Sequence, residues 1–83
     1  MVKLARGRIE LGDIAGARLL LERAASGREP NALMALAETY DPAMLTRWGA
    51  RGLKGDIAKA RELYQTAAES GLAEARTRVL AVR

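Results

Sequence analysis

The side chains that could do chemistry in this 83-residue chain are few, because it contains no His and no Cys. Serine–histidine and cysteine–histidine catalysis, imidazole or thiolate metal sites and a disulfide framework are therefore excluded. Glu38 and Asp41 are close enough to share a face at a helix end, but paired-acid catalysis needs an enclosed pocket and a raised pKa on one partner. We expect both carboxylates to be solvated, and we predict no enzyme, no cofactor and no metal.

Glycines between residues 49 and 56, GARGLKGD, superficially suggest a phosphate-binding loop. The segment has no Lys-Ser or Lys-Thr pair and no preceding strand. In addition, Asp56 would put a negative charge at the helix N-terminus, where a phosphate should lie. We interpret these glycines as turn residues.

An internal repeat organises the chain. Residues 12–25, GDIAGARLLLERAA, return 43 positions later as residues 55–68, GDIAKARELYQTAA, and nine of the 14 positions are identical. A repeat of this length is one supersecondary unit that cannot bury its apolar face alone, so such units stack into an array. Apolar residues at helical spacing predict an amphipathic helix in each copy, with Asp13 and Asp56 as N-caps.

Three further apolar stripes predict three further helices. The middle one opens at Pro30, a favoured first-turn residue, and closes before Pro42. Gly27 and Gly71 supply stops for the repeated helices. We therefore predict an all-α fold, an α-solenoid of antiparallel helix pairs with about five helices. The single domain, 1–83, divides into a first repeat (1–29), a second repeat (30–71) with an inserted loop (41–54), and a terminal helix (72–83).

The segments ALMALAETY (32–40) and GDIAKARELYQTAAESG (55–71) resemble the Sel-one-like repeat of the tetratricopeptide superfamily. The matching positions are Ala32, Leu36, Tyr40, Asp56, Lys59, Ala60, Tyr64, Ala67, Ala68, Glu69 and Gly71. Ala37 departs from the pattern, because the family has Gly there, and it needs slightly more room at the helix crossing. The resemblance implies a right-handed superhelix, and it implies a bacterial scaffold or protein-interaction module whose partner the signature does not identify.

The inserted loop is the part that the repeat explains least. Thirteen residues separate Leu4 from Ala17, whereas 24 separate the equivalent Leu36 and Ala60. The loop contains the only Trp and a Pro-initiated stretch that could form a short helix. One interpretation is that Met44, Leu45 and Trp48 fill the widened gap between helices, and the other is that the loop contacts a ligand. The partner-binding hypothesis names Tyr40, Arg47, Trp48, Arg51, Leu53 and Lys54, which would grip an acidic or amphipathic peptide.

Charge suggests the alternative function. A net charge of +4 and a pI near 10.1 would permit a basic helical module that binds nucleic acid. Acidic residues are interleaved throughout, however, and no aromatic-plus-basic module appears. We expect a non-catalytic protein-interaction module that binds a protein or peptide in the repeat groove, and not a nucleic-acid binder.

Two apolar patterns give structural expectations. We expect Ala17, Ala24, Ala60 and Ala67 to form a buried small-residue seam. The terminal helix leaves Val79, Leu80 and Val82 without a following helix, so we expect either a longer protein or self-association through this edge.

Membrane and export signals are weak in this sequence. No stretch approaches the roughly 20 apolar residues that span a bilayer, and the N-terminus lacks the apolar block of a signal peptide. We expect a soluble protein that is cytoplasmic by default, or periplasmic if it belongs to a longer exported protein.

Overall fold

Six helices make up most of the chain. The computed structural model describes residues 1–50 and 52–82, and over these ranges it contains helices and turns but no strand. The helices are α1 (Val2–Glu10), α2 (Ile14–Ser26), α3 (Pro30–Tyr40), α4 (Pro42–Arg47), α5 (Ile57–Glu69) and α6 (Ala73–Ala81). The all-α class is confirmed for this part of the chain, and so is the short helix in the inserted loop.

Acidic side chains cap the two repeated helices. The side chain of Asp13 accepts a hydrogen bond from the backbone N–H of Gly16 at 2.9 Å, and Asp56 accepts one from Lys59 at 3.1 Å. Each carboxylate satisfies a backbone donor that the first helical turn leaves without a partner. The predicted N-caps of α2 and α5 are confirmed.

Proline and glycine set the remaining boundaries. Pro30 and Pro42 occupy the first turns of α3 and α4, where a residue without an N–H is tolerated. Gly27 caps α2 at its C-terminus. Gly71 comes directly after the C-cap of α5 with a φ of +106°, a conformation that favours a residue without a side chain.

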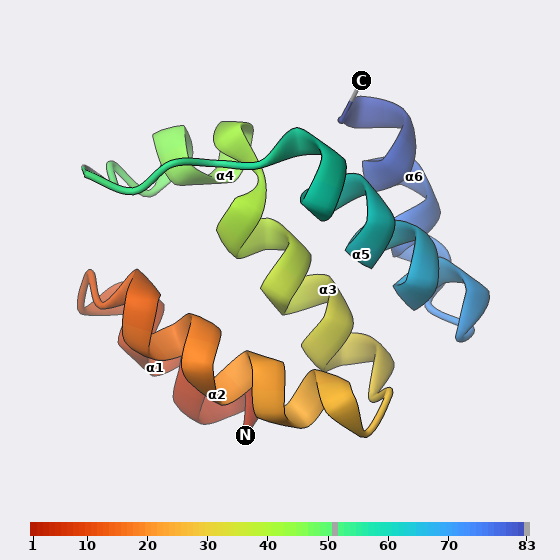
Figure 1. Ribbon diagram of the computed structural model, residues 1–83, viewed down its shortest axis with the longest axis horizontal. Helices are drawn as coiled ribbons and strands as arrows, with labels where there is room; N and C mark the ends of the chain where they lie inside the picture. The colour runs from red at the N-terminus through yellow and green to blue at the C-terminus, as the bar shows by residue number, and fades with distance from the viewer. Residues whose placement is uncertain (51, 83) are drawn as a thin grey trace.

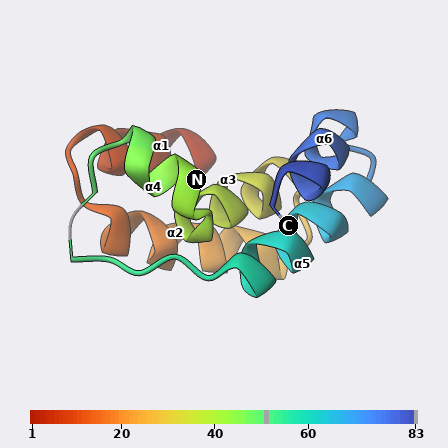
Figure 2. The ribbon, with the colours of Figure 1, turned by 90° about the horizontal axis from the view of Figure 1, so that it is seen from above.

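The helices pack in chain order. α1 packs on α2, α2 on α3, α3 on α5 and α5 on α6, while α4 lies against the end of α3 (Figure 1). Seen from above, α1 and α6 lie on one side of α3, and α2 and α5 lie on the other (Figure 2). Because α3 is central, every residue from Ala32 to Thr39 is buried. Among the described helices, none combines the length and the apolar character needed to cross a membrane.

Two apolar clusters lie on either side of α3, and the central helix contributes to both. The first core cluster joins α1, α2, α3 and α4 through Ala5, Ile9, Ile14, Ala17, Leu21, Ala35, Leu36 and Leu45. The second core cluster joins α3, α5 and α6 through Leu33, Met34, Ala37, Ala60, Tyr64, Ala67, Ala75 and Val82.

The alanine seam is present with one exception. Ala17, Ala60 and Ala67 are fully buried, as predicted. The prediction is wrong for Ala24, which is only partly buried. Ala24 lines an open hollow beside the start of α1, together with Met1 and other residues. No neighbouring helix therefore covers Ala24 fully.

The exposed terminal edge is smaller than the sequence suggested. Val82 is buried in the second core cluster, so the expectation that it would lack cover is wrong. Helix α6 ends at Ala81, and the Nε atom of Arg61 donates a hydrogen bond to the Val82 carbonyl at 2.9 Å. Val79 remains partly buried, and Leu80 is 61% exposed.

The 43-residue repeat extends to a hydrogen bond between helices. Arg18 in α2 donates from Nη2 to the carbonyl of Thr39 in α3, just as Arg61 in α5 donates to that of Val82 after α6. Donors and acceptors are each 43 positions apart. Arg is one of the nine identical residues, and its role is to satisfy a carbonyl that a helix end leaves without a helical partner.

Candidate partner-binding surface

The inserted segment, residues 41–54, is closed at its base by backbone contacts. The N–H of Asp56 donates to the carbonyl of Tyr40 at 2.7 Å. Gly55 is required at this crossing, because a Cβ there would lie 2.8 Å from Cγ of Pro42 and 2.9 Å from the Tyr40 oxygen. The two ends of the segment therefore meet in a contact that leaves no room for a side chain.

Arg18 fastens the same base from α2. Its Nη2 atom donates to the carbonyl of Thr39, before the inserted segment, and to that of Lys54, at its end, with 3.3 Å for the second bond. One guanidinium thus holds both ends of the inserted segment. Sequence analysis missed this role, although the identity of Arg18 and Arg61 in the repeat was the signal for it.

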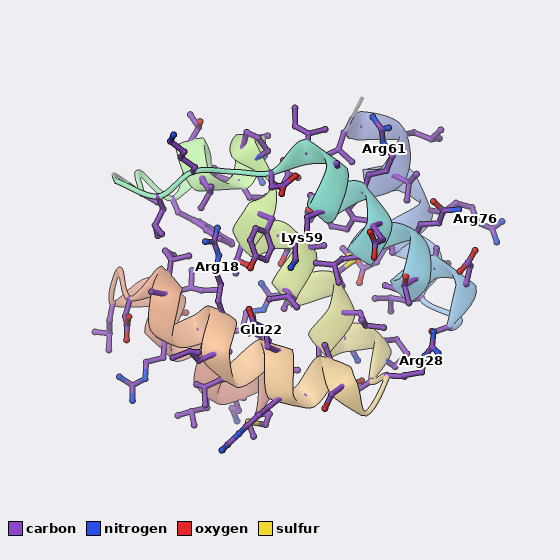
Figure 3. The ribbon with its side chains drawn as sticks, in the orientation of Figure 1. Arg18, Glu22, Arg28, Lys59, Arg61 and Arg76 are labelled. Atoms are coloured by element: carbon purple, nitrogen blue, oxygen red, sulfur yellow. The ribbon has the colours of Figure 1, made fainter. Side chains whose placement is uncertain are left out.

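Tyr40 lies among charged side chains on the α2 and α5 side of the base. The guanidinium carbon of Arg18 is 4.0 Å from the centre of the Tyr40 ring, and Nζ of Lys59 is 5.0 Å from it. The Tyr40 hydroxyl is 3.5 Å from Oε1 of Glu22, to which it donates. Figure 3 shows Arg18, Glu22 and Lys59 converging in the space between α2 and α5.

The apolar side chains of the inserted segment pack on the core. Leu45 is buried in the first core cluster, and Trp48 and Leu53 are partly buried against it. The backbone N–H of Ala50 donates to the Leu45 carbonyl at 2.9 Å, which folds the chain back after α4. These contacts favour the gap-filling interpretation for Leu45 and Trp48, and they leave part of the indole on the surface.

Two cations of the segment lie on the surface. Arg47 and Lys54 are exposed, and neither side chain has a salt-bridge partner among residues 1–50 and 52–82. Arg51, the third predicted cation, lies outside the described residues. The structure thus places Tyr40 beside the base, Trp48 and Leu53 on the first core cluster, and Arg47 at the end of α4.

Glu38 and Asp41 are buried, so the expectation that they would be solvated is wrong. They are 4% and 5% exposed. Glu38 accepts from Nη1 of Arg6 at 2.7 Å and pairs with Nη1 of Arg78 at 2.9 Å. The reason is topological, since α1 and α6 flank α3 and each brings an arginine over its C-terminal half.

Asp41 completes this network with a tyrosine. It accepts from the hydroxyl of Tyr64 at 2.8 Å and from the backbone N–H of Ala43 at 3.0 Å, while Arg78 donates to the Tyr64 oxygen at 3.3 Å. Burial and then the bond to Asp41 raise the pKa of Tyr64 well above its ordinary value. Burial alone would lower the pKa of Arg78, but its bond to Tyr64 and the charge of Glu38 raise it.

The polar network, defined as Arg6, Glu38, Asp41, Tyr64 and Arg78, positions the inserted segment. Asp41 is the N-cap of α4 and is held by a hydroxyl from α5, so the start of the segment is fixed from a third helix. Both carboxylates of the network have protein partners. Within the described part of the chain, no group of three or more acidic side chains is arranged to hold a metal ion.

No family model, curated protein or solved structure matches the chain. The function must therefore be inferred from the internal repeat and from the surface that the repeat leaves exposed. That surface is the inserted segment together with the Tyr40 side of its base.

Proposed function

We propose that the chain is a Sel-one-like helical repeat module that binds a protein or peptide partner and catalyses no reaction. The equivalent hydrogen bonds of Arg18 and Arg61 support this assignment, because the repeat extends from the sequence to the contacts between helices. In a superhelical array of this type, the repeated residues hold neighbouring helices together, and the residues outside the repeat pattern are available for recognition.

The single observation that carries the proposal is the fastened base of the inserted segment. The Tyr40–Asp56 backbone bond and the double contact of Arg18 hold its ends. Because its ends are fastened, the segment has less conformational entropy to lose on binding, which favours recognition. The segment presents two exposed cations, Arg47 and Lys54, and a partly exposed Trp48, and Arg and Trp are frequent anchors of interfaces.

An acidic peptide fits this surface better than nucleic acid does. Five arginines already have partners within the chain: Arg6, Arg8 and Arg78 pair with carboxylates, and Arg18 and Arg61 bind backbone carbonyls. A nucleic-acid site needs a continuous row of cations free to neutralise phosphates. The exposed Arg47 and Lys54 of the inserted segment, with Lys59 at 5.0 Å from the Tyr40 ring, suit a short acidic or amphipathic segment instead.

Peptide display against the full chain tests the proposal. We expect the selected peptides to be enriched in Asp and Glu and to bind at low salt. The double substitution Arg47→Ala and Lys54→Ala should weaken binding at least tenfold, about 1.4 kcal/mol. The matched control, Lys3→Ala and Arg23→Ala, removes the same charge from exposed positions outside the segment and should change the affinity little.

Two results would contradict the proposal. Equal loss of affinity in both double variants would mean that net charge, and not the inserted segment, attracts the peptide. Tighter binding of a labelled single-stranded oligonucleotide than of any selected peptide, with steep salt dependence, would favour the nucleic-acid alternative.

A further inference from the structure

A groove between α5 and α6 is the counterpart, 43 residues later, of a surface of α3 that α5 covers. Leu33, Leu36 and Ala37 of α3 are buried, and two of them share the second core cluster with α5. The residues 43 positions later are Arg76, Val79 and Leu80. Arg76 is exposed, Val79 is partly buried and Leu80 is 61% exposed. The same helix face is therefore covered by a helix in one unit and open in the other.

The groove has an apolar floor and a polar rim. Ala68, Val79 and Leu80 supply the floor, and Gln65, Glu69 and Arg76 supply the rim. Arg76 lies at the outer edge of the molecule (Figure 3). An apolar floor with charged borders is the arrangement that accepts the apolar face of an amphipathic helix.

The two walls of the groove, α5 and α6, are joined in the same way as their counterparts α2 and α3. Arg61 ties α5 to the end of α6 just as Arg18 ties α2 to the end of α3. Ala60 of α5 is fully buried, as is its counterpart Ala17 in α2. Since α5 packs on α3, whose counterpart is α6, a helix of similar kind is the occupant that the α5/α6 groove fits.

We propose that the α5/α6 groove binds one amphipathic helix of a partner protein, seated as α5 is seated on α3. The seated face of α5 carries Ala60 and Ala67, seven residues apart, with Tyr64 between them. The partner helix should likewise carry small residues seven apart. Arg76 of α6 occupies the position that Leu33 occupies in α3. The partner helix should therefore also carry a carboxylate that faces Arg76.

A second copy of this chain is not the occupant that the structure favours. The helices of the chain that carry the alanine seam are α2 and α5, and Ala17, Ala60 and Ala67 are already fully buried within the fold. Ala24 is only partly buried, but its partner Ala17 is fully buried, so a folded copy exposes no pair of seam alanines seven residues apart. The groove is separate from the inserted segment. The two proposals are therefore tested independently of each other.

The test uses a peptide with the sequence of residues 55–70, which frees the seam of α5 from the fold. The labelled peptide is titrated into the full chain and binding is followed by fluorescence anisotropy. We expect Leu80→Asp to weaken binding at least tenfold and Leu19→Asp, an exposed leucine of α2, to leave it unchanged. A peptide with Leu at the positions of Ala60 and Ala67 should not bind.

The cost of forming an isolated helix could hide the interaction, so a fusion provides a second measurement. Residues 55–70 are appended after Arg83 through a flexible linker, which raises their effective concentration. We expect a higher Tm than for a fusion whose appended helix carries the two Leu substitutions.

Three outcomes would overturn the proposal. The first is equal binding of the peptide to the wild-type chain and to Leu80→Asp. The second is equal Tm values for the two fusions. The third is a concentration-dependent dimer, measured by sedimentation equilibrium, that Leu80→Asp abolishes, because this would assign the groove to a second copy.

Discussion

The two repeated helices bury different side chains at the same position. Leu21 of α2 and Tyr64 of α5 are 43 residues apart, and both are fully buried. Leu21 lies in a cluster of aliphatic side chains, whereas Tyr64 donates to Asp41 and accepts from Arg78. One framework of caps and alanines therefore supports an apolar centre in one unit and a polar one in the other.

The inserted segment accounts for a second difference between the units. Ile14 and Ile57 follow the two capping aspartates, yet Ile14 is 2% exposed and Ile57 is 44% exposed. Ile14 shares the first core cluster with Leu45, so the inserted segment contributes to the core around the start of α2. The segment thus completes the first unit in addition to presenting its cations.

The largest expected effect comes from breaking the polar centre at Glu38. In Glu38→Gln, Arg6 and Arg78 lose their shared carboxylate. Removing one partner of a buried pair typically costs about 3–5 kcal/mol, and partial exposure of both arginines reduces this to about 2–3 kcal/mol. Urea unfolding measures the change. Glu22→Gln, at an exposed carboxylate of α2, should stay within about 0.5 kcal/mol of wild type; equal losses would mean that the network adds nothing.

The alanine seam offers a matched pair of substitutions. Ala67 is fully buried, while its counterpart Ala24 is only partly buried. Overpacking should make Ala67→Leu less stable by about 1–3 kcal/mol, and Ala24→Leu by less than half of that. Thermal unfolding of both variants checks this. A larger loss at Ala24 would show that the first unit is packed as tightly as the second.

The helices were predictable from sequence because their signals are local. Asp13 and Asp56 accept bonds from N–H groups three residues ahead, and Pro30 and Pro42 restrict the backbone at their own positions. The 43-residue identity also located the seam, apart from Ala24.

The polar network was not predictable in the same way. The partners of Glu38 come from α1 and α6, near opposite ends of the chain, and no spacing rule links them. For the candidate surface, sequence identified the inserted segment but not the fastening of its base by Arg18. These contacts depend on how helices cross, which a periodic pattern does not specify.

The Tyr64 hydroxyl should make the free energy of unfolding depend on pH in the alkaline range. Tyr64→Phe removes one hydrogen-bond partner from each of Asp41 and Arg78, which keep the Ala43 N–H and Glu38, and should cost about 1–2 kcal/mol near neutral pH. Because the pKa of Tyr64 is raised in the folded state, its contribution is present below the ordinary value of 10.0 and is lost as the pH rises above it. Unfolding between pH 8 and 11.5 should therefore bring wild type and Tyr64→Phe closer together. Parallel curves would contradict the raised pKa.

The smallest effect separates the two equivalent arginines. Arg18 binds two carbonyls and lies over Tyr40, whereas Arg61 binds one carbonyl. Substitution by Met keeps the apolar stem but removes the donors, so we expect Arg18→Met to cost about 1–2 kcal/mol and Arg61→Met about half as much. Hydrogen exchange should locate the difference. The amide of Asp56, which closes the inserted segment, should exchange faster in Arg18→Met and at the wild-type rate in Arg61→Met. If the amide is unaffected by both substitutions, the backbone contact between Tyr40 and Asp56 holds the segment without Arg18, and the arginine serves only the helix end in each unit.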